Sequence, residues 1–536
     1  MSSSTPPSKP IASRSLASQA YAKAIAEDRA LLETKHRGLL MMAVVLVSLV
    51  QFFDATIANV ALPFMKASLG ASNETVSWVL TSFIMATAIA TPLCGWLSDT
   101  IGSRNLFMYA TLLFLVSSAA CGAAPSLSAM IAFRIIQGIS AAFIGPMTMT
   151  IMFDISPPSK QPTSMAIFGM MVMVAPITGP AVGGFITEYM NWRWIYYVNL
   201  PLGIPALVLI WWLLPSRPIE RRKLDLFGFA VLGIGLAAMQ LMFDRGQSKD
   251  WFASKEIVAE VIIMISALWI FLVHSRGHPN PLFKRALYTN ANFVASLAFM
   301  MVMGASVVGL SSVLPMMFQS IYHYPVMDTG LLMAPRGIGV MCTSLLSGWL
   351  ARKYDARFVI LIGYLFAAWG MWTMTSWSLD MGSTPILLAS FIQGMGFGLI
   401  VTPMQLMAFS TLDQSLRPDG SSLMSLFRSF GGSIGISVVV TMLSRNQQIS
   451  HADLAAHVTA SSVPTFDWTG TLDKMGGMGG SVMAMINGEV SRQALMIAFL
   501  DNFYMLTWVL LAFAPLPLLL KKPKPAGAAE KLPVME

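Results

Sequence analysis

The chain has 536 residues, of which 55% are hydrophobic and only 11% are charged, with a formal net charge of +8. A soluble domain carries about 25% charged residues, so this chain lacks the charge to cover a surface in water. Composition therefore excludes a soluble globular protein and predicts an all-α polytopic membrane protein that is solvated by lipid.

Apolar runs of about 20 residues recur along the chain and predict fourteen membrane-spanning helices. They cover 38–62, 75–97, 105–124, 127–152, 164–187, 194–214, 226–243, 256–274, 291–314, 329–350, 358–378, 385–408, 422–443 and 496–519. Residues 1–37 are polar without a continuous apolar core, which predicts a cytosolic tail and not a signal peptide. Residues 521–536 form a second tail. Residues 444–495 are predicted as a long outer loop, either a flexible linker or a docking surface.

The basic residues orient these spans. With the N-terminus inside, the inner segments hold 23 Lys and Arg residues, the outer segments hold 8, and three lie within spans. This bias follows the positive-inside rule and predicts that both termini are cytosolic. The positive charge is thereby assigned to membrane topology, and binding of nucleic acid is not indicated.

Two motifs recur at nearly the same spacing along the chain. "GWLSDTIGSR" at 95–104 returns as "GWLARKYDAR" at 348–357, and "IIQG" at 135–138 returns as "FIQG" at 391–394. The offsets predict two parallel six-helix halves, a design of secondary transporters. We expect one half over 38–214, the other over 291–520, and a linker with two inserted spans over 215–290.

Six stretches of the sequence resemble signatures of one transporter family. They are "FFDATIANVALP" (52–63), "GWLSDTIGSRN" (95–105), "RIIQG" (134–138), "APITGPAVGG" (175–184), "WRWIYYVNLPLG" (192–203) and "LDLFG" (224–228). Together they resemble the major facilitator superfamily, and within it the fourteen-span drug:proton antiporters of the EmrB/QacA type. The long last outer loop resembles the EmrB branch.

The resemblance implies a proton-coupled multidrug efflux antiporter in the bacterial inner membrane that exports hydrophobic or amphipathic compounds. It further implies a tripartite pump with a periplasmic adaptor protein and an outer-membrane channel, and no cofactor beyond the proton gradient. A narrower metabolite or nutrient transporter on the same fold is the alternative function. The sequence leaves open whether the substrates are cations or anions.

Three charged residues inside predicted spans are candidates for proton coupling: Asp54, Arg134 and Asp501. A carboxylate in the hydrocarbon region costs several kcal/mol, so it is paired, faces a cavity or is protonated. Asp54 is the first candidate proton carrier and Asp501 the second. Arg134 is a fixed cation that can stabilise a charged carboxylate in one conformation and release it in another. The alternative is that Asp54 and Arg134 each form permanent structural contacts.

Polar side chains within apolar spans are candidates for orienting a substrate in a cavity. These are Gln51, Thr56, Asn59, Gln137, Arg336, Gln405 and Asn502. The 41 methionines include flexible side chains that suit a promiscuous apolar pocket, although most are expected to face lipid.

Two further groups follow from the resemblance. The gating loop comprises Gly95, Asp99, Gly102 and Arg104, and implies a latch between spans 2 and 11 that stabilises the outward-closed state; the alternative is a set of solvated loop charges. The antiporter motif of span 5 comprises Pro176, Gly179, Pro180, Gly183 and Gly184. Prolines and glycines in one helix favour a bent hinge that seals tightly against a neighbour, with ordinary close packing as the alternative.

Other classes of function lack their signatures. No Gly-Lys dipeptide is present, so the chain has no P-loop for a primary pump. An enzyme requires clusters of histidine, cysteine or carboxylate, and the six histidines lie in loops or at span ends without metal-ligand spacing. We therefore expect neither an enzyme nor a metal site.

Overall fold

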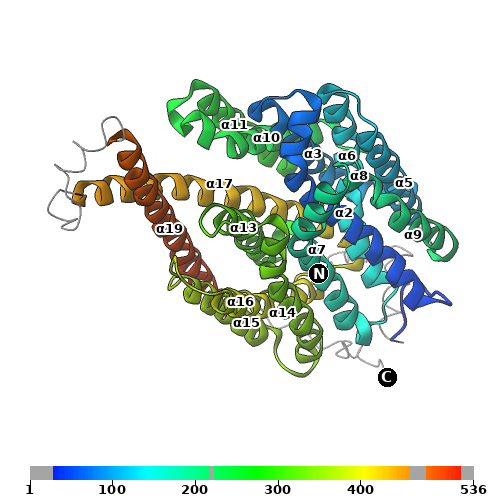
Figure 1. The fold of residues 1–536 in the computed structure, drawn as a ribbon. Coiled ribbons are helices and arrows are strands. Elements are labelled where there is room, and N and C mark those ends of the chain that lie inside the picture. Colours follow the sequence, from blue (N-terminus) through cyan, green and yellow to red (C-terminus); the bar gives the residue numbers. More distant parts are fainter. Residues whose placement is uncertain (1–27, 216, 218, 220–221, 459–478, 521–536) are drawn as a thin grey trace, which may run out of the picture.

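The computed structural model describes the chain except residues 1–27, 216, 218, 220–221, 459–478 and 521–536, and is a helical bundle (Figure 1). Thirteen helices among the described residues are long and apolar enough to cross a membrane. Helices predominate because lipid offers no hydrogen bonds to a backbone, so each spanning segment satisfies its own polar groups. The predicted all-α fold class is confirmed.

The first half occupies the right of Figure 1. Its helices are α2 (Arg37–Leu69), α3 (Asn73–Ala90), α4 (Cys94–Ile101), α5 (Ser103–Gly122), α6 (Leu127–Asp154), α7 (Gln161–Tyr189), α8 (Trp194–Tyr197) and α9 (Asn199–Leu213). A single 3-10 turn, Thr91–Leu93, joins α3 to α4, so that these two helices form one span. The fifth predicted span lies within α7.

The remaining helices form the inserted pair and the second half. They are α10 (Leu226–Arg245), α11 (Lys255–Gly277), α12 (Arg285–Thr289), α13 (Ala291–Ser320), α14 (Val326–Lys353), α15 (Ala356–Met374), α16 (Ser383–Ser410), α17 (Arg417–His457) and α19 (Gly479–Phe513). The pair α10 and α11 lies to one side of the bundle in Figure 1. Every predicted span coincides with one of these helices or with those of the first half.

Local chemistry marks several helix ends. Ser72 and Thr75 form a capping box at the start of α3, each side chain accepting the other's backbone N–H. Gly70 after α2 has φ +62° and Gly102 between α4 and α5 has φ +88°, a region that favours glycine. Gly102 thereby permits the sharp turn of the predicted gating loop.

The two halves repeat the same packing. The helix pairs α2·α7, α3·α6 and α5·α6 have the counterparts α13·α17, α14·α16 and α15·α16. Gly138 in α6 and Gly394 in α16 occupy equivalent crossings, because a Cβ there would lie 2.5 Å from the Phe83 carbonyl oxygen and 2.1 Å from the Arg336 carbonyl oxygen. The glycines of the repeated motif therefore let two backbones approach closely in each half.

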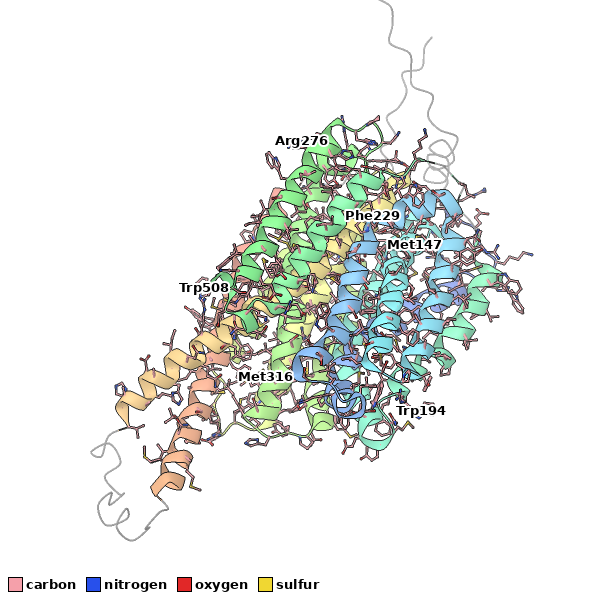
Figure 2. The ribbon with its side chains drawn as sticks, turned by 90° about the horizontal axis from the view of Figure 1, so that it is seen from above. Met147, Trp194, Phe229, Arg276, Met316 and Trp508 are labelled. Carbon is pink, nitrogen blue, oxygen red and sulfur yellow. The ribbon has the colours of Figure 1, made fainter. Side chains whose placement is uncertain are left out.

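Contacts between the halves run mainly through α7 against α14 and α6 against α17, while α10 contacts both α3 and α17. Large apolar side chains face outward around the bundle, as expected in lipid. Trp194 and Trp508, labelled in Figure 2, are 52% and 54% exposed.

The segment predicted as a long loop, 444–495, is helical at both ends. Helix α17 continues to His457 and α19 begins at Gly479, and the two helices extend together beyond the bundle in Figure 1. Side-chain hydrogen bonds join them, from Asn446 to Asp501 (3.1 Å) and between His451 and Asn487 (2.9 Å). We call residues 444–457 and 479–495 the helical hairpin. The middle of the predicted loop lies outside the described residues.

Candidate functional site

A buried ion pair lies inside the first half. Nη1 of Arg134 on α6 lies 2.6 Å from Oδ2 of Asp54 on α2, and both side chains are completely inaccessible to solvent. An ion pair at this depth is stable only with close geometry and additional hydrogen bonds, because both charges have lost their hydration. The structure thus brings together two of the three predicted coupling residues.

Two amides complete the surroundings of the Asp54 carboxylate. Nε2 of Gln137 and Nδ2 of Asn199 both donate to Oδ1, at 3.0 and 2.8 Å. Gln137 also accepts from Nη1 of Arg134 at 2.9 Å, and Asn199 donates to the Ser118 hydroxyl at 2.9 Å. The carboxylate therefore receives hydrogen bonds from three side chains, which replace part of the hydration lost on burial.

Arg134 is held by contacts beyond Asp54. Its Nε donates to the Val79 carbonyl oxygen (3.1 Å), and the guanidinium carbon lies 4.2 Å from the ring centroid of Phe83 and 5.7 Å from that of Tyr196. Its Nη2 has no hydrogen-bond partner among the described residues. This buried N–H group can therefore donate a hydrogen bond to a new acceptor if the surrounding helices move.

Asn199 was not among the residues predicted for this site. It begins α9, 145 positions after the aspartate it contacts. Its signal in the sequence is a single polar residue opening the apolar stretch "NLPLG" (199–203). That signal identifies a polar contact within a span but not its partner.

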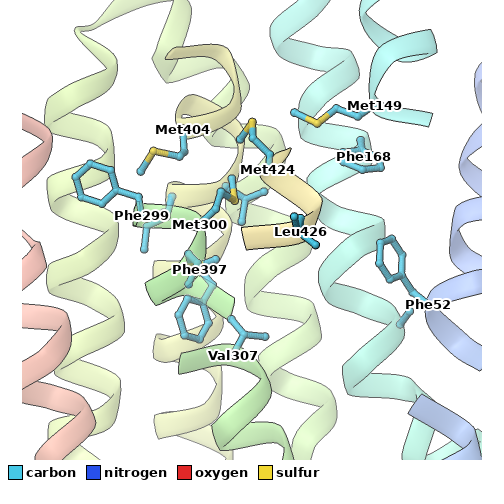
Figure 3. Packing of buried hydrophobic residues seen from close by; sticks show 14 of the residues in the cluster. Phe52, Met149, Phe168, Phe299, Met300, Val307, Phe397, Met404, Met424 and Leu426 are labelled. Atoms are coloured by element: carbon cyan, nitrogen blue, oxygen red, sulfur yellow. The ribbon is translucent and has the colours of Figure 1, made fainter. Parts of the chain in front are cut away.

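A cavity that is partly open to solvent lies between the two halves. Its walls come from α2, α6 and α7 on one side and from α13, α16 and α17 on the other. Apolar side chains dominate its lining, among them Phe52, Met149, Phe168, Met300, Met303, Val307 and Met424. Figure 3 shows several of them facing one another across the interface. Flexible thioethers and aromatic rings suit apolar ligands of varied shape.

Arg428 gives this cavity a positive charge. It lies on α17 among the lining residues, and its guanidinium carbon is 5.0 Å from the ring centroid of Phe52. Among the described residues, neither a carboxylate lining the cavity nor an ion pair of Arg428 is found. Arg428 was not among the residues predicted for a substrate cavity, and the structure places it in the cavity lining.

Gln405, on α16, is the predicted cavity residue that lines the cavity. The structure places the others elsewhere. Gln137 belongs to the Asp54 cluster, and Asn59 is exposed on the surface of α2. Thr56 donates to backbone oxygens of its own helix and faces α7. Gln51 is buried near Gly145, which does line the cavity.

Arg336 and Asn502 also lie away from the cavity lining. Arg336 is buried within the second half, where its Nη1 donates to the Ser311 hydroxyl at 3.1 Å. Asn502 donates to the Val439 carbonyl oxygen at 3.2 Å and so joins α19 to α17. Both side chains donate to a neighbouring helix, as a polar residue in a span can do outside a cavity, and their contact with a substrate stays a prediction.

Asp501, the second predicted proton carrier, is not near Asp54. It is exposed on α19 and accepts a hydrogen bond from Asn446 at the base of the helical hairpin. This contact joins α17 to α19 and has no connection to the buried cluster.

Ionic contacts join the halves at the end of the bundle where the described chain starts and stops, which we call the terminal end. Arg222 in the linker lies 3.2 Å from Asp99 on α4 and 2.8 Å from Asp419 on α17. Gly95 allows this approach, because a Cβ there would lie 1.6 Å from Oδ1 of Asp419. Asp99 of the predicted gating loop thus takes part in an ionic contact, but Arg222 supplies the cation, whereas Arg104 donates to the Trp211 carbonyl oxygen.

A second ionic cluster at the terminal end was not predicted. Asp154, at the last position of α6, is paired with Arg217 of the linker (2.5 Å) and with Arg417 at the start of α17 (3.2 Å). Next to it, the hydroxyls of Thr150 and Ser421 lie 2.9 Å apart across the same interface.

Both latches join α17, and not the predicted span 11, to the first half. A contact at the terminal end stabilises closure of that end. The expectation that the gating loop stabilises an outward-closed state stays a prediction.

The antiporter motif lies where α7 meets α2. A Cβ at Gly179 would lie 2.3 Å from the Thr56 hydroxyl, and one at Gly183 would lie 3.0 Å from a methyl group of Ile57. Gly184 is buried in the same helix, and α7 runs without interruption through Pro176 and Pro180. The structure describes the backbone of these two prolines but not their side chains. The close packing is observed, and the hinge stays a prediction.

These features together define a class of protein. Two repeated six-helix halves, an apolar cavity between them and ionic latches at one end are the design of a secondary transporter, in which the halves rock about a central site.

Comparison with known proteins identifies the family. The profile of the Major Facilitator Superfamily matches residues 44–436. The chain is 32% identical over 507 residues to Multidrug export protein EmrB of Escherichia coli (strain K12), covering 92% of this chain and 98% of that protein. It is 31% identical over 484 residues to Fatty acid resistance protein FarB of Neisseria gonorrhoeae, covering 89% and 94%.

Solved structures show the same fold. The proton:xylose symporter XylE bound to 6-bromo-6-deoxy-D-glucose aligns with a TM-score of 0.56 and 13% identity, covering 90% of this chain and 96% of that one. The chain belongs to the major facilitator superfamily, and within it to the EmrB branch. The predicted family is confirmed.

Proposed function

We propose that this protein is a proton-driven antiporter that exports hydrophobic or amphipathic compounds through the bacterial inner membrane, with both termini in the cytosol. The buried ion pair of Asp54 and Arg134 carries this proposal, because proton coupling requires a carboxylate whose charge depends on conformation. The names of EmrB and FarB, a multidrug export protein and a fatty acid resistance protein, support export. The proton gradient is its sole energy source, and the protein catalyses no reaction.

The arrangement suggests how coupling works. With Arg134, Gln137 and Asn199 in contact, the Asp54 carboxylate is paired and is closed to solvent. Proton uptake requires the helices α2, α6 and α9 to separate. Protonation neutralises one partner of the pair, and Arg134 then loses its strongest electrostatic contact. Proton binding and movement of the first half are thereby linked.

The lining of the cavity suits an apolar substrate that carries a negatively charged or polarised group. Its lining is formed by methionine and phenylalanine side chains, and Arg428 is the charged residue among them.

We further propose that the helical hairpin contacts a periplasmic adaptor, which leads to an outer-membrane channel. It extends beyond the bundle and exposes Ile449 (61%), Met483 (57%) and Met485 (77%). These apolar side chains lie beyond the length of about 20 residues that a membrane helix needs, so that lipid does not cover them.

Transport by purified protein in liposomes with an imposed pH gradient tests the function. A dye inside the liposomes reports proton movement when apolar acids, cations or neutral compounds are added one at a time. We expect substrate-triggered proton flux in the wild type and its loss in Asp54→Asn. The control is Asp501→Asn, which removes a carboxylate from a spanning helix outside the cluster and should retain the flux. Loss in Asp501→Asn with retention in Asp54→Asn would overturn the assignment, and no flux with any compound would overturn drug export.

A further inference from the structure

A group of metal-binding residues lies away from the cavity and the ion pair, where the inserted helices meet. Asp225 precedes α10, His274 is in the last turn of α11, and His278 follows that helix. One possible ligand atom from each lies within 4.8 Å of the others. Figure 2 shows their neighbours Phe229 and Arg276 at the same end of the bundle.

We propose that Asp225, His274 and His278 form a binding site for a divalent transition-metal ion of the Zn²⁺ type. Two imidazoles and one carboxylate are ligands that Zn²⁺ and Co²⁺ prefer, whereas Mg²⁺ and Ca²⁺ prefer oxygen ligands alone. Water supplies the fourth ligand. The site departs from the sequence analysis, which found no metal spacing among the histidines. The spacing exists, since His274 and His278 are four apart, but the carboxylate comes from 49 residues away.

Asp225 is already oriented as a ligand. Its Oδ1 accepts from the backbone N–H of Gly228 (2.8 Å), which caps α10, and lies 2.9 Å from Nε2 of His274. Its Oδ2 is buried and has no hydrogen-bond partner among the described residues, although the side chain is only 2% exposed. A buried carboxylate oxygen without a partner is costly, and a bound cation satisfies it.

The histidines can adjust to an ion. Donor atoms of a tetrahedral Zn²⁺ site lie about 3.3 Å apart, so the group has to contract slightly. His274 is 22% exposed and His278 is partly exposed, which leaves both rings room to rotate. Nδ1 of His278 accepts one long hydrogen bond, from the Asn280 N–H (3.2 Å). If Nδ1 of His278 binds the metal, the ring loses only this hydrogen bond from Asn280.

An open cavity beside the group provides access for the ion and its water. Asp225 lines it together with Asp99, Arg222, Lys223, Asn280 and Lys284. The cations in this wall repel a metal ion, while Asp99 and Asp225 attract it. Arg222 is paired with Asp99 and Asp419, so that these carboxylates compensate its charge. A bound ion fixes the start of α10 to the end of α11 and stiffens the inserted pair.

Metal binding to the purified full-length protein, without a polyhistidine tag, tests the proposal. After treatment with a chelator, the protein in detergent is titrated with Zn²⁺ or Co²⁺ and followed by calorimetry. We expect one equivalent per chain in the wild type and at least tenfold weaker binding in His278→Ala and Asp225→Asn. Asparagine caps helices as well as aspartate does, so Asp225→Asn removes a charged ligand without removing the cap.

The control variant is His323→Ala, which removes a histidine outside the group and should bind as the wild type does. Zn²⁺ should raise the unfolding temperature of the wild type and of this control, but not that of His278→Ala, since only a specific ligand stabilises the folded state. Mg²⁺ should have no effect. The proposal would be overturned if the wild type bound less than one equivalent of metal. It would also be overturned if His278→Ala and Asp225→Asn bound the metal with the same affinity as the wild type. These readouts do not involve transport, so they are independent of the proposed antiport.

Discussion

Arg134 and Asp54 form an ion pair of 2.6 Å in which neither side chain touches solvent. Removing one partner of such a pair leaves an uncompensated buried charge, which costs about 3–5 kcal/mol. Removing both charges costs much less. The difference in stability between the single and the double substitution therefore distinguishes a charged pair from two residues that only pack together.

We therefore predict that Arg134→Met destabilises the protein strongly and that adding Asp54→Asn restores most of the loss. Thermal unfolding in detergent of the wild type, both single variants and the double variant provides the coupling energy. For contacting residues we expect about 0.5–3 kcal/mol, and the value should lie near the upper end. Additive effects of the two substitutions would show that Asp54 is protonated in the resting protein.

Asn199 donates a 2.8 Å hydrogen bond to the Asp54 carboxylate. Replacing it with leucine removes a donor to a carboxylate, an interaction of about 1.5–3 kcal/mol. We therefore expect the free energy of unfolding of Asn199→Leu to fall by about that amount, because a buried acceptor is left without one of its partners.

Thermal unfolding of Asn199→Leu in detergent tests this loss of stability. The matched control is Asn59→Leu, the same substitution on the exposed surface of α2, which should unfold at the same temperature as the wild type. Equal unfolding temperatures in Asn199→Leu and Asn59→Leu would contradict the assigned role of the amide.

The latch at the terminal end depends on Gly95. An added Cβ would lie 1.6 Å from Asp419, far closer than two atoms can approach, so Gly95→Ala should prevent the terminal end from closing. We expect transport to fall at least tenfold while the protein still folds. Gly38→Ala is the control, because nothing lies within 4 Å of the added atom.

Accessibility of the interface provides the second readout for the latch. Ser421, buried against Thr150, can be replaced by cysteine in a protein without its native cysteines. A water-soluble thiol reagent should label this position faster in the Gly95→Ala background than in the Gly38→Ala background. Equal labelling rates would show that the contact does not control closure.

The spans were predictable because the length and hydropathy of a segment are properties of that segment alone. The repeat was predictable because its glycines recur at nearly the same offset. The site was only partly predictable. Asp54 and Arg134 could be chosen as charges in lipid, but their pairing spans 80 residues. Arg222 and Asp419 are 197 apart, and nothing near either residue indicates the other.

The placement of Arg428 shows the same limit. Its depth in the span was visible in the sequence, but which face of α17 turns toward the other half was not. Similarly, Thr56 and Asn502 were plausible cavity residues until the packing of neighbouring helices showed where their hydrogen bonds go.

Arg428 leads to a prediction about substrate charge. Because it is the charged residue among the described lining of the cavity and its guanidinium lies against the Phe52 ring, Arg428→Gln removes the cavity's positive charge but retains polar contacts. A charge-assisted hydrogen bond is worth about 1.5–3 kcal/mol, so transport of apolar acids should weaken about 10- to 150-fold in apparent affinity. Neutral apolar compounds should be transported as before, and lipophilic cations should be transported better.

Arg445→Gln is the matched control, since Arg445 is exposed on the same helix beyond the cavity. Competition assays in liposomes, with one acid, one neutral compound and one cation of similar size, measure the three affinities in each variant. An equal loss for all three compounds in Arg428→Gln would mean that this arginine supports the cavity's shape, whereas a loss confined to the acid means that it selects substrate charge. If Arg445→Gln also lost affinity for the acid alone, the loss would come from the overall positive charge of α17 and not from a charge in the cavity.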